Sequence, residues 1–286
     1  MHDPSQKQGT PQGRIEALLG AVESARAAGQ PGAEAAALGE LSGFYALSGQ
    51  PEQAIEAAEA ALTLFRQIGD QDGQARLLGN LGAIYHQMRQ PWRAVQYYEL
   101  ALSAARTDGD RRVEASTLLN LGTIYAQGGQ PLRAVDSINR ALAIRRESGD
   151  RAGEASALAA LGSAYFALRQ PATAVPLYEQ AIAIAREIGD HALEAAQRGN
   201  LGSAYHRLGD LEAAARCFEA ALEAARAASE PPTLAVMALN LGLVREAQGR
   251  PAEALPLVEE ARSLLPEGSP LLQHCDEALA RLRGNP

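Results

Sequence analysis

Asparagine recurs at a fixed spacing along this sequence, in a pattern that suits the binding of another polypeptide. Four asparagines follow a forty-residue register, and two positions of that register depart from it: Asn80, Asn120, Asn200 and Asn240, with Glu40 and Ala160 as the departures. A carboxamide carries hydrogen-bond donors and an acceptor together. A row of such side chains can therefore hold the backbone of an extended peptide without reading its sequence. The alternative is a structural role, in which the asparagines bond neighbouring helices.

Residues suited to catalysis or metal binding are few and scattered. The chain has one lysine, Lys7, in an N-terminal segment that we expect to be disordered, so the folded part offers no phosphate-loop lysine and no Schiff-base amine. His86 and His206 occupy the same position three repeats apart, too far to share a metal ion whose ligands lie within ~2 Å of it. The sequence contains no Gly-x-Ser-x-Gly elbow and no His-Glu-x-x-His pair. We therefore expect no enzyme, no cofactor and no metal site.

The elements that position the asparagines repeat with the same forty-residue period. Within residues 111–150, an apolar stripe at helical spacing runs to Tyr125, a turn follows at Gly129-Gln130-Pro131, and a second stripe runs to Leu142. Glycine can take the left-handed conformation that ends a helix, and proline suits the first position of the next helix. Gly149-Asp150 closes the unit, with an aspartate able to cap the following helix. Self-similarity of this kind indicates an array of helix pairs.

This pattern resembles the tetratricopeptide repeat family, whose units carry Leu-Gly, Tyr and two alanines at fixed spacing. The leucines are Leu41, Leu81, Leu121, Leu161, Leu201 and Leu241; the next residue is Gly82, Gly122, Gly162, Gly202 or Gly242, with Ser42 in the first unit. The family's terminal proline is present only as Pro266. Elsewhere arginine stands there: Arg66, Arg106, Arg146, Arg186 and Arg226. The helix continues through these arginines, which makes this the longer subtype, similar to the repeats of kinesin light chains and Leu-Gly-Asn adaptors.

The resemblance implies an all-α fold, a right-handed superhelical α-solenoid of stacked antiparallel helix pairs. We expect a disordered tail at residues 1–10 and an N-terminal half-repeat helix at residues 11–30. Six forty-residue repeats fill residues 31–270, and a C-terminal capping helix and tail follow at residues 271–286. These elements add up to fourteen predicted helices and no strand.

Composition and charge favour a cytoplasmic protein with a protein or peptide partner. No segment approaches the ~18 uninterrupted apolar residues of a membrane helix, so we expect no membrane contact. The net charge of −8 argues against nucleic acid. Cys217 and Cys275 are expected to be reduced thiols in the core. Arginines at the Arg146 position are expected to stabilise the negative ends of their helices, whereas Arg111 and Arg112 could equally steer an acidic partner.

Stacked helix pairs with a small rotation per repeat create an extended concave surface. The resemblance implies that the first helix of each pair lines this groove and that, in related adaptors, the asparagine row holds a bound peptide. Partner selection is expected from first-helix positions that vary between units: Arg76, His86, Thr123, Gln127, Ser163, Phe166, Ser203 and His206.

The sequence thus predicts a non-catalytic adaptor that binds an extended or partly helical peptide segment of a partner in the concave groove. One alternative is a scaffold that forms homo-oligomers through repeat edges or the surface around Trp92. Another is a peptide-sensing regulator that acts on a separate effector. Trp92 is expected to be either partly buried against the adjoining turn or an exposed anchor. Arg89 and Arg169 replace a turn glycine, at ~1 kcal/mol each if the backbone is left-handed there.

Overall fold

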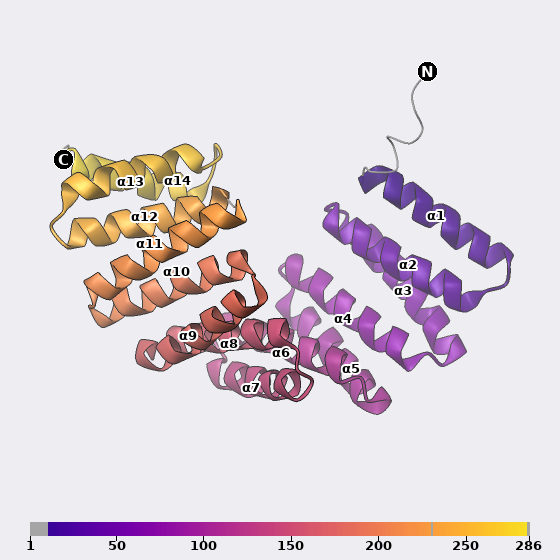
Figure 1. Ribbon diagram of the computed structural model, residues 1–286. Helices are drawn as coiled ribbons and strands as arrows, with labels where there is room; N and C mark the ends of the chain where they lie inside the picture. The colour runs from indigo at the N-terminus through magenta and orange to yellow at the C-terminus, as the bar shows by residue number, and fades with distance from the viewer. Residues whose placement is uncertain (1–10, 230, 285–286) are drawn as a thin grey trace, which may run out of the picture. The chain divides into compact units, whose positions relative to one another are not determined.

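Every described residue lies in an α-helix or in a short turn (Figure 1). The computed structural model describes residues 11–229 and 231–284, and within these ranges it contains no strand. The chain falls into two compact units, Met1–Ile144 and Arg145–Pro286. The disordered tail expected at residues 1–10 lies outside the described residues.

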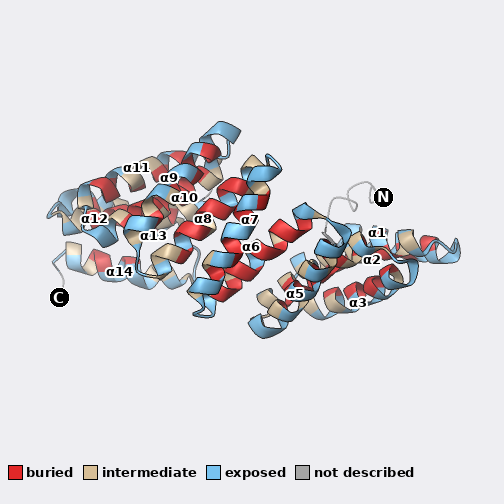
Figure 2. Ribbon diagram, turned by 90° about the horizontal axis from the view of Figure 1, so that it is seen from below, coloured by how far each residue is buried: buried red, intermediate tan, exposed pale blue. Residues whose placement is uncertain are grey.

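The first unit carries α1 to α6 and most of α7: α1 (Pro11–Ala27), α2 (Pro31–Leu47), α3 (Pro51–Ile68), α4 (Gln71–Gln87), α5 (Pro91–Asp108), α6 (Arg111–Gln127) and α7 (Pro131–Glu147). The second unit continues with α8 (Arg151–Ala167), α9 (Pro171–Ile188), α10 (His191–Leu208), α11 (Leu211–Ala228), α12 (Pro231–Ala247), α13 (Pro251–Leu264) and α14 (Pro270–Leu282). The described part of the chain therefore contains the fourteen helices expected from the sequence. On these helices, buried residues alternate with exposed ones (Figure 2).

Two kinds of turn join the helices, as the sequence predicts. Within a pair, a left-handed residue follows the first helix, and the second helix begins at proline in every described pair except α10–α11, where Leu211 stands; Gly129 has a φ of 69° and Pro131 opens α7. Before α4, α6, α8 and α10, a glycine is followed by an aspartate that caps the next helix. The Oδ1 atom of Asp150 accepts a hydrogen bond from the backbone N–H of Gly153 at 2.8 Å. This bond, aided by Arg145, lowers the pKa of Asp150.

Arg89 and Arg169, which replace a turn glycine, do have the left-handed conformation. Their φ angles are 56° and 58°, and Ser229 replaces the turn glycine between two pairs with a φ of 56°. A side chain at such a position is strained because Cβ crowds the backbone, which glycine avoids. These turns keep the geometry of their glycine counterparts, so the helix packing on either side imposes the conformation.

In the second to sixth pairs, the helices meet where a glycine of the first faces a larger side chain of the second. A Cβ atom on Gly82 would lie 2.8 Å from the Tyr98 ring, and one on Gly162 would lie 2.7 Å from the Tyr178 ring. A closely packed interior has no room for that atom. In the first pair the same two positions carry Ser42 and Ala58, both fully buried. In this pair, serine replaces the glycine of the first helix, and alanine replaces the large side chain of the second.

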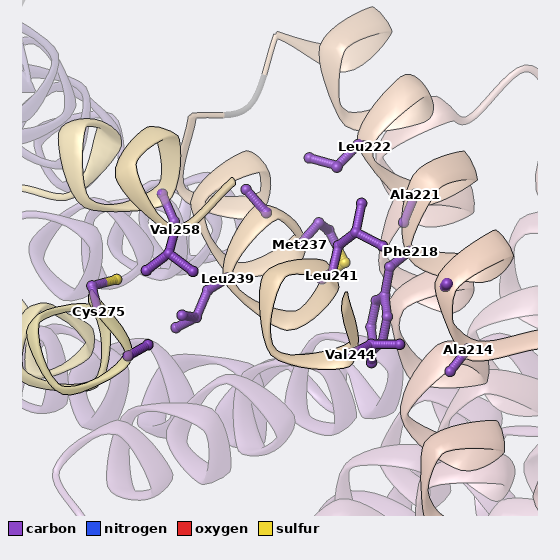
Figure 3. Packing of buried hydrophobic residues seen from close by; sticks show 14 of the residues in the cluster. Ala214, Phe218, Ala221, Leu222, Met237, Leu239, Leu241, Val244, Val258 and Cys275 are labelled. Atoms are coloured by element: carbon purple, nitrogen blue, oxygen red, sulfur yellow. The ribbon is translucent and has the colours of Figure 1, made fainter. Parts of the chain in front are cut away.

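The last helices of the second unit close its core at the C-terminal end. Val258 of α13 and Cys275 of α14 are fully buried, in a cluster that includes Leu239 and Leu241 of α12 (Figure 3). The opposite face of α14 is polar and exposed. Cys275 and the half-buried Cys217 are free thiols, and burial raises the pKa of Cys217 to about 11. The expected core location is thus confirmed for Cys275, whereas Cys217 is only half-buried.

An arginine near the end of a second helix pairs with a glutamate early in the next first helix. The Nε atom of Arg106 lies 2.9 Å from Oε1 of Glu114, and the same pairing at Arg146 and Glu154 measures 2.8 Å. Both glutamates are buried, and the hydrogen bond from Arg146 lowers the pKa of Glu154. These arginines therefore connect successive pairs, a role beyond the helix-end stabilisation expected of them. Arg111 also contacts Glu114, at 3.0 Å, so its charge is engaged inside the protein.

Candidate peptide-binding groove

A cavity of about 550 Å³ lies in the first unit, lined mainly by the first helices of three successive pairs, α2, α4 and α6. Its polar lining is Glu40, Arg76, Asn80, Arg112, Ser116, Thr117 and Asn120. The rest of the lining is small or apolar and includes Gly39, Gly43, Gly79, Phe65, Leu77 and Val113. The cavity therefore combines hydrogen-bonding groups with helix surface that carries little side-chain bulk.

Three of the residues predicted to bind a peptide line this one cavity: Arg76, Asn80 and Asn120. The two asparagines are exposed, and neither side chain makes a hydrogen bond within the described chain. Their donors and acceptors are consequently available to a polypeptide that enters the cavity. In these two repeats the asparagines do not bond neighbouring helices, which is what the structural alternative requires.

The charged groups around the cavity are largely paired with each other. A guanidinium nitrogen of Arg76 lies 2.7 Å from Oδ2 of Asp72, one turn earlier on α4. Burial raises the pKa of Asp72, and the neighbouring carboxyl of Asp110 raises it further while Arg76 opposes the shift. Burial also works to raise the pKa of Asp110, but the backbone N–H of Val113, the Asp72 carboxyl and Arg112 outweigh it, so that pKa is lowered. The cavity thus has no strong excess of either charge.

The corresponding asparagines of the second unit lie in a different environment. Asn200 is half-buried and donates to Oε1 of Gln197 at 3.0 Å, on the same helix α10. Gln197 is itself only 5% exposed. Asn240 of α12 is half-buried as well. The four asparagines therefore share a register but do not share one local arrangement.

The other predicted contact residues are mostly engaged with their own repeats. His86 Nε2 and Gln127 Oε1 lie 2.8 Å apart, which joins α4 to α6 near the C-terminal ends of both helices. The hydroxyls of Thr123, Ser163 and Ser203 donate to backbone carbonyls four residues earlier. The guanidinium of Arg207 lies over the Phe166 ring, 5.2 Å from its centre. His206 is exposed near the end of α10. None of these seven predicted residues lines the cavity.

Sequence reasoning missed the small residues in the cavity, above all Gly43 and Gly79. A Cβ atom on either would have no neighbour within 4 Å outside its own helix. Both residues lie inside a helix, where glycine is unfavourable relative to alanine. A glycine in the middle of a helix, at a repeat position that faces the groove, was the signal from which these two residues could have been predicted. The buried Thr117 was missed as well, because threonine at a helical core position looks like ordinary packing.

Trp92 is 70% exposed on α5, and Leu132 at the matching position of α7 is 77% exposed. Of the two environments expected for Trp92, the structure thus has the exposed one. Trp92 and Leu132 do not line the cavity between the first helices.

No group of three or more histidine, cysteine, aspartate or glutamate side chains in the described ranges is arranged to hold a metal ion. Across the same part of the chain, every helix is too short or too polar to cross a membrane.

Stacked helix pairs, repeated turn chemistry and a groove between first helices define a helical-repeat protein of the kind that presents an interaction surface. The family model of the tetratricopeptide repeat matches residues 33–107, 113–187 and 192–267. The chain belongs to the tetratricopeptide repeat family. Repeats of this family typically mediate protein–protein interactions.

Solved structures share the fold. BtubC (BKLC) from P. vanneervenii is 24% identical, with 77% of this chain and 93% of that chain covered and a TM-score of 0.70. A putative kinesin light chain with nearly identical TPR-like repeats from Podosopora anserina is 24% identical, with 67% and 94% covered and a TM-score of 0.57.

The Signal Transduction ATPase with Numerous Domains (STAND) protein PH0952 from Pyrococcus horikoshii, which has a tetratricopeptide repeat sensor, is 17% identical to this chain. The similarity covers 98% of this chain and 45% of that protein, with a TM-score of 0.77. None of the curated proteins compared with the chain matches it. At these identities the structural likeness concerns the fold alone.

Proposed function

We propose that this chain is a non-catalytic, cytoplasmic interaction adaptor that binds an extended segment of a partner protein in the cavity lined by α2, α4 and α6. The observation that carries the proposal is the state of Asn80 and Asn120. Both line the cavity, both are exposed, and neither makes a hydrogen bond within the described chain. An extended backbone offers alternating N–H and C=O groups, which carboxamides can satisfy from either side.

The spacing of the two asparagines supports a segment rather than a single small molecule. They stand on neighbouring first helices, α4 and α6, and helices in contact lie about 8–10 Å apart. A strand rises about 3.3 Å per residue, so residues about three apart in an extended peptide can meet both side chains. The fold supplies the groove, but the argument for binding rests on these side chains and not on the family alone.

The proposal is tested with peptides selected by the immobilised full-length chain from a random display library. The double variant Asn80→Ala/Asn120→Ala should weaken binding of the selected peptides at least tenfold, which corresponds to about 1.4 kcal/mol. Such a loss is expected when two hydrogen bonds worth about 0.5–1.5 kcal/mol each are removed. Alanine is the better helix former, so the variant should fold as the parent does.

The matched control is Asn139→Ala. Asn139 is an exposed asparagine of the first unit that lies on α7, a second helix outside the cavity. Its replacement should leave the affinity of the selected peptides unchanged. If the double variant also binds them as tightly as the parent, the cavity is not the binding surface. Failure to select any peptide would count against the adaptor function itself.

A further inference from the structure

Successive first helices pack through a recurring contact between two positions that lie 38 residues apart. A Cβ atom on Gly39 would lie 3.8 Å from Cδ1 of Leu77, and one on Gly199 would lie 2.6 Å from Cε of Met237. In both cases a large side chain of one first helix covers a glycine of the preceding one. The side chain at the second of the two positions therefore fills the space between the two helices.

The same register pairs Gly79 with Thr117, and here the space is not filled. No atom outside its own helix comes within 4 Å of where a Gly79 Cβ would stand. Thr117 is shorter than leucine or methionine, and both residues line the cavity between α2, α4 and α6. The pair thus leaves a hollow beside Gly79, at the position where Leu77 or Met237 covers the glycine in the other two pairs.

Thr117 gives that hollow a hydrogen-bonding group. The residue is only 2% exposed, yet it lines the cavity, and its hydroxyl makes no hydrogen bond within the described chain. That hydroxyl is therefore open to a hydrogen bond from a group that enters the cavity. Glycine at the middle of α4 is unfavourable relative to alanine, and it is the residue that allows another backbone to approach closely. Neither residue is explained by packing inside the chain, whereas a bound group explains both.

We propose that Gly79 and Thr117 form a socket for one uncharged hydrogen-bonding side chain, a hydroxyl or a carboxamide, of the extended segment bound between Asn80 and Asn120. The proposal rests on the proposed function and deepens it, because it names the chemistry that the groove selects. The bound backbone passes close over Gly43 and Gly79, where no Cβ stands in its way.

The charges around the socket favour an uncharged occupant. Arg76 forms an ion pair with Asp72, and Arg112 attracts the Asp110 carboxylate electrostatically. With Glu40, the carboxylates around the socket outnumber the two guanidiniums, so no net positive charge remains to neutralise a bound carboxylate, and the apolar Leu77 and Val113 line the same cavity. Burying a charge without a partner is strongly unfavourable, whereas a hydroxyl or amide needs only the Thr117 hydroxyl.

The test uses a positional-scanning library of synthetic peptides, with each position fixed in turn as each natural amino acid, against the full-length chain. One position should select Ser, Thr, Asn or Gln. Thr117→Val keeps the shape and removes the hydroxyl, so that selection should disappear and the best peptide should lose about tenfold in affinity. Thr117→Ser keeps the hydroxyl and should retain the selection.

Gly79→Ala fills the hollow without touching the hydroxyl. It should weaken the best peptides and shift the selected residue toward Gly or Ala. Gly20→Ala is the matched control, because Gly20 also lies inside a helix of the first unit with no neighbour within 4 Å, but on α1 and outside the cavity. This control should select the same residues as the parent.

The outcomes separate the socket from the groove. Peptides that bind the parent, Thr117→Val and Gly79→Ala alike would overturn the socket while the proposed adaptor function stands. Selection of Asp or Glu at the position that responds to Thr117→Val would overturn the uncharged occupant. A library in which no peptide binds the parent would overturn the proposed function, and the socket with it.

Discussion

The first helices α4 of the first unit and α10 of the second carry the same repeat residues, a glycine followed by an asparagine, in opposite states. Asn80 and Asn120 are exposed and make no hydrogen bond within the described chain, whereas Asn200 is half-buried and bonded to Gln197. Gly79 faces open space, whereas Gly199 is covered by the end of Met237. The difference arises from the residue 38 positions after the glycine, on the next first helix. Its side chain is short in the first unit, where it is Thr117, and long in the second, where it is Met237.

This contrast teaches that a consensus residue has no single role in a repeat array. The asparagine and the glycine are shared by both regions, so they cannot by themselves determine whether a surface is open. The residue that decides lies in the next repeat, where packing either uses the space or leaves it. A small residue 38 positions after the glycine, on the next first helix, therefore identifies an open region. Each of the following variants changes one residue of the open region or of the filled one.

The largest effect is expected from shortening the two covering side chains. Met237→Ala should cost about 2–5 kcal/mol, because it empties a filled core position. Thr117→Ala removes one methyl group, worth about 0.8 kcal/mol, together with a hydroxyl that has no partner, and so should cost less than about 1 kcal/mol. Amide hydrogen exchange should show lost protection in α10 to α12 for the first variant and little change in α4 to α6 for the second. Equal losses in the two regions would mean that the hollow at Thr117 is as well packed as the site of Met237.

The second largest effect on the free energy of unfolding is expected from replacing one of the asparagines by alanine. Asn200→Ala leaves the buried Oε1 atom of Gln197 without its partner, at about 1–3 kcal/mol. The better helix propensity of alanine returns up to about 0.7 kcal/mol. Asn120→Ala breaks no hydrogen bond within the described chain, so only the gain in helix propensity remains. Urea unfolding followed by circular dichroism should therefore show a lower midpoint for Asn200→Ala and an unchanged or higher one for Asn120→Ala. A lower midpoint for both would indicate that Asn120 is a structural tie.

Most of the fold was predictable because its signals are local. The glycine, proline and aspartate of each turn act within a few residues, and Gly149-Asp150 predicts both a left-handed helix end and a capped helix start. The arginine–glutamate pairs that join successive helix pairs were missed, although their spacing of eight residues recurs at Arg106, Arg146 and Arg186. A charged residue at a helix end has a sufficient local explanation, and that explanation hid the longer contact.

The candidate groove was predictable only in part, because its shape depends on residues that are distant in the sequence. The asparagine register correctly places Asn80 and Asn120 on first helices, off the core stripe. It carries no information on whether Gln197 will bond Asn200, or on whether Arg207 will cover Phe166. Those contacts join side chains whose rotamers are chosen by packing. The sequence pattern therefore identifies candidate positions, and the neighbours in space decide which of them remain open.

The smallest effect is expected from adding one methyl group to each of the two glycines. Gly79→Ala should stabilise α4 by about 0.5–1 kcal/mol, because its Cβ meets open space and alanine is the better helix former. Gly199→Ala has the same intrinsic gain, but its Cβ would stand 2.6 Å from Cε and Sδ of Met237. That side chain is flexible and can shift, at a strain that offsets the gain, so the net change should be close to zero. Hydrogen exchange should show slower exchange in α4 of the first variant and no such slowing in α10 of the second. A gain of similar size in both helices would mean that the Met237 side chain shifts without strain. Met237 would then cover Gly199 without packing tightly against it.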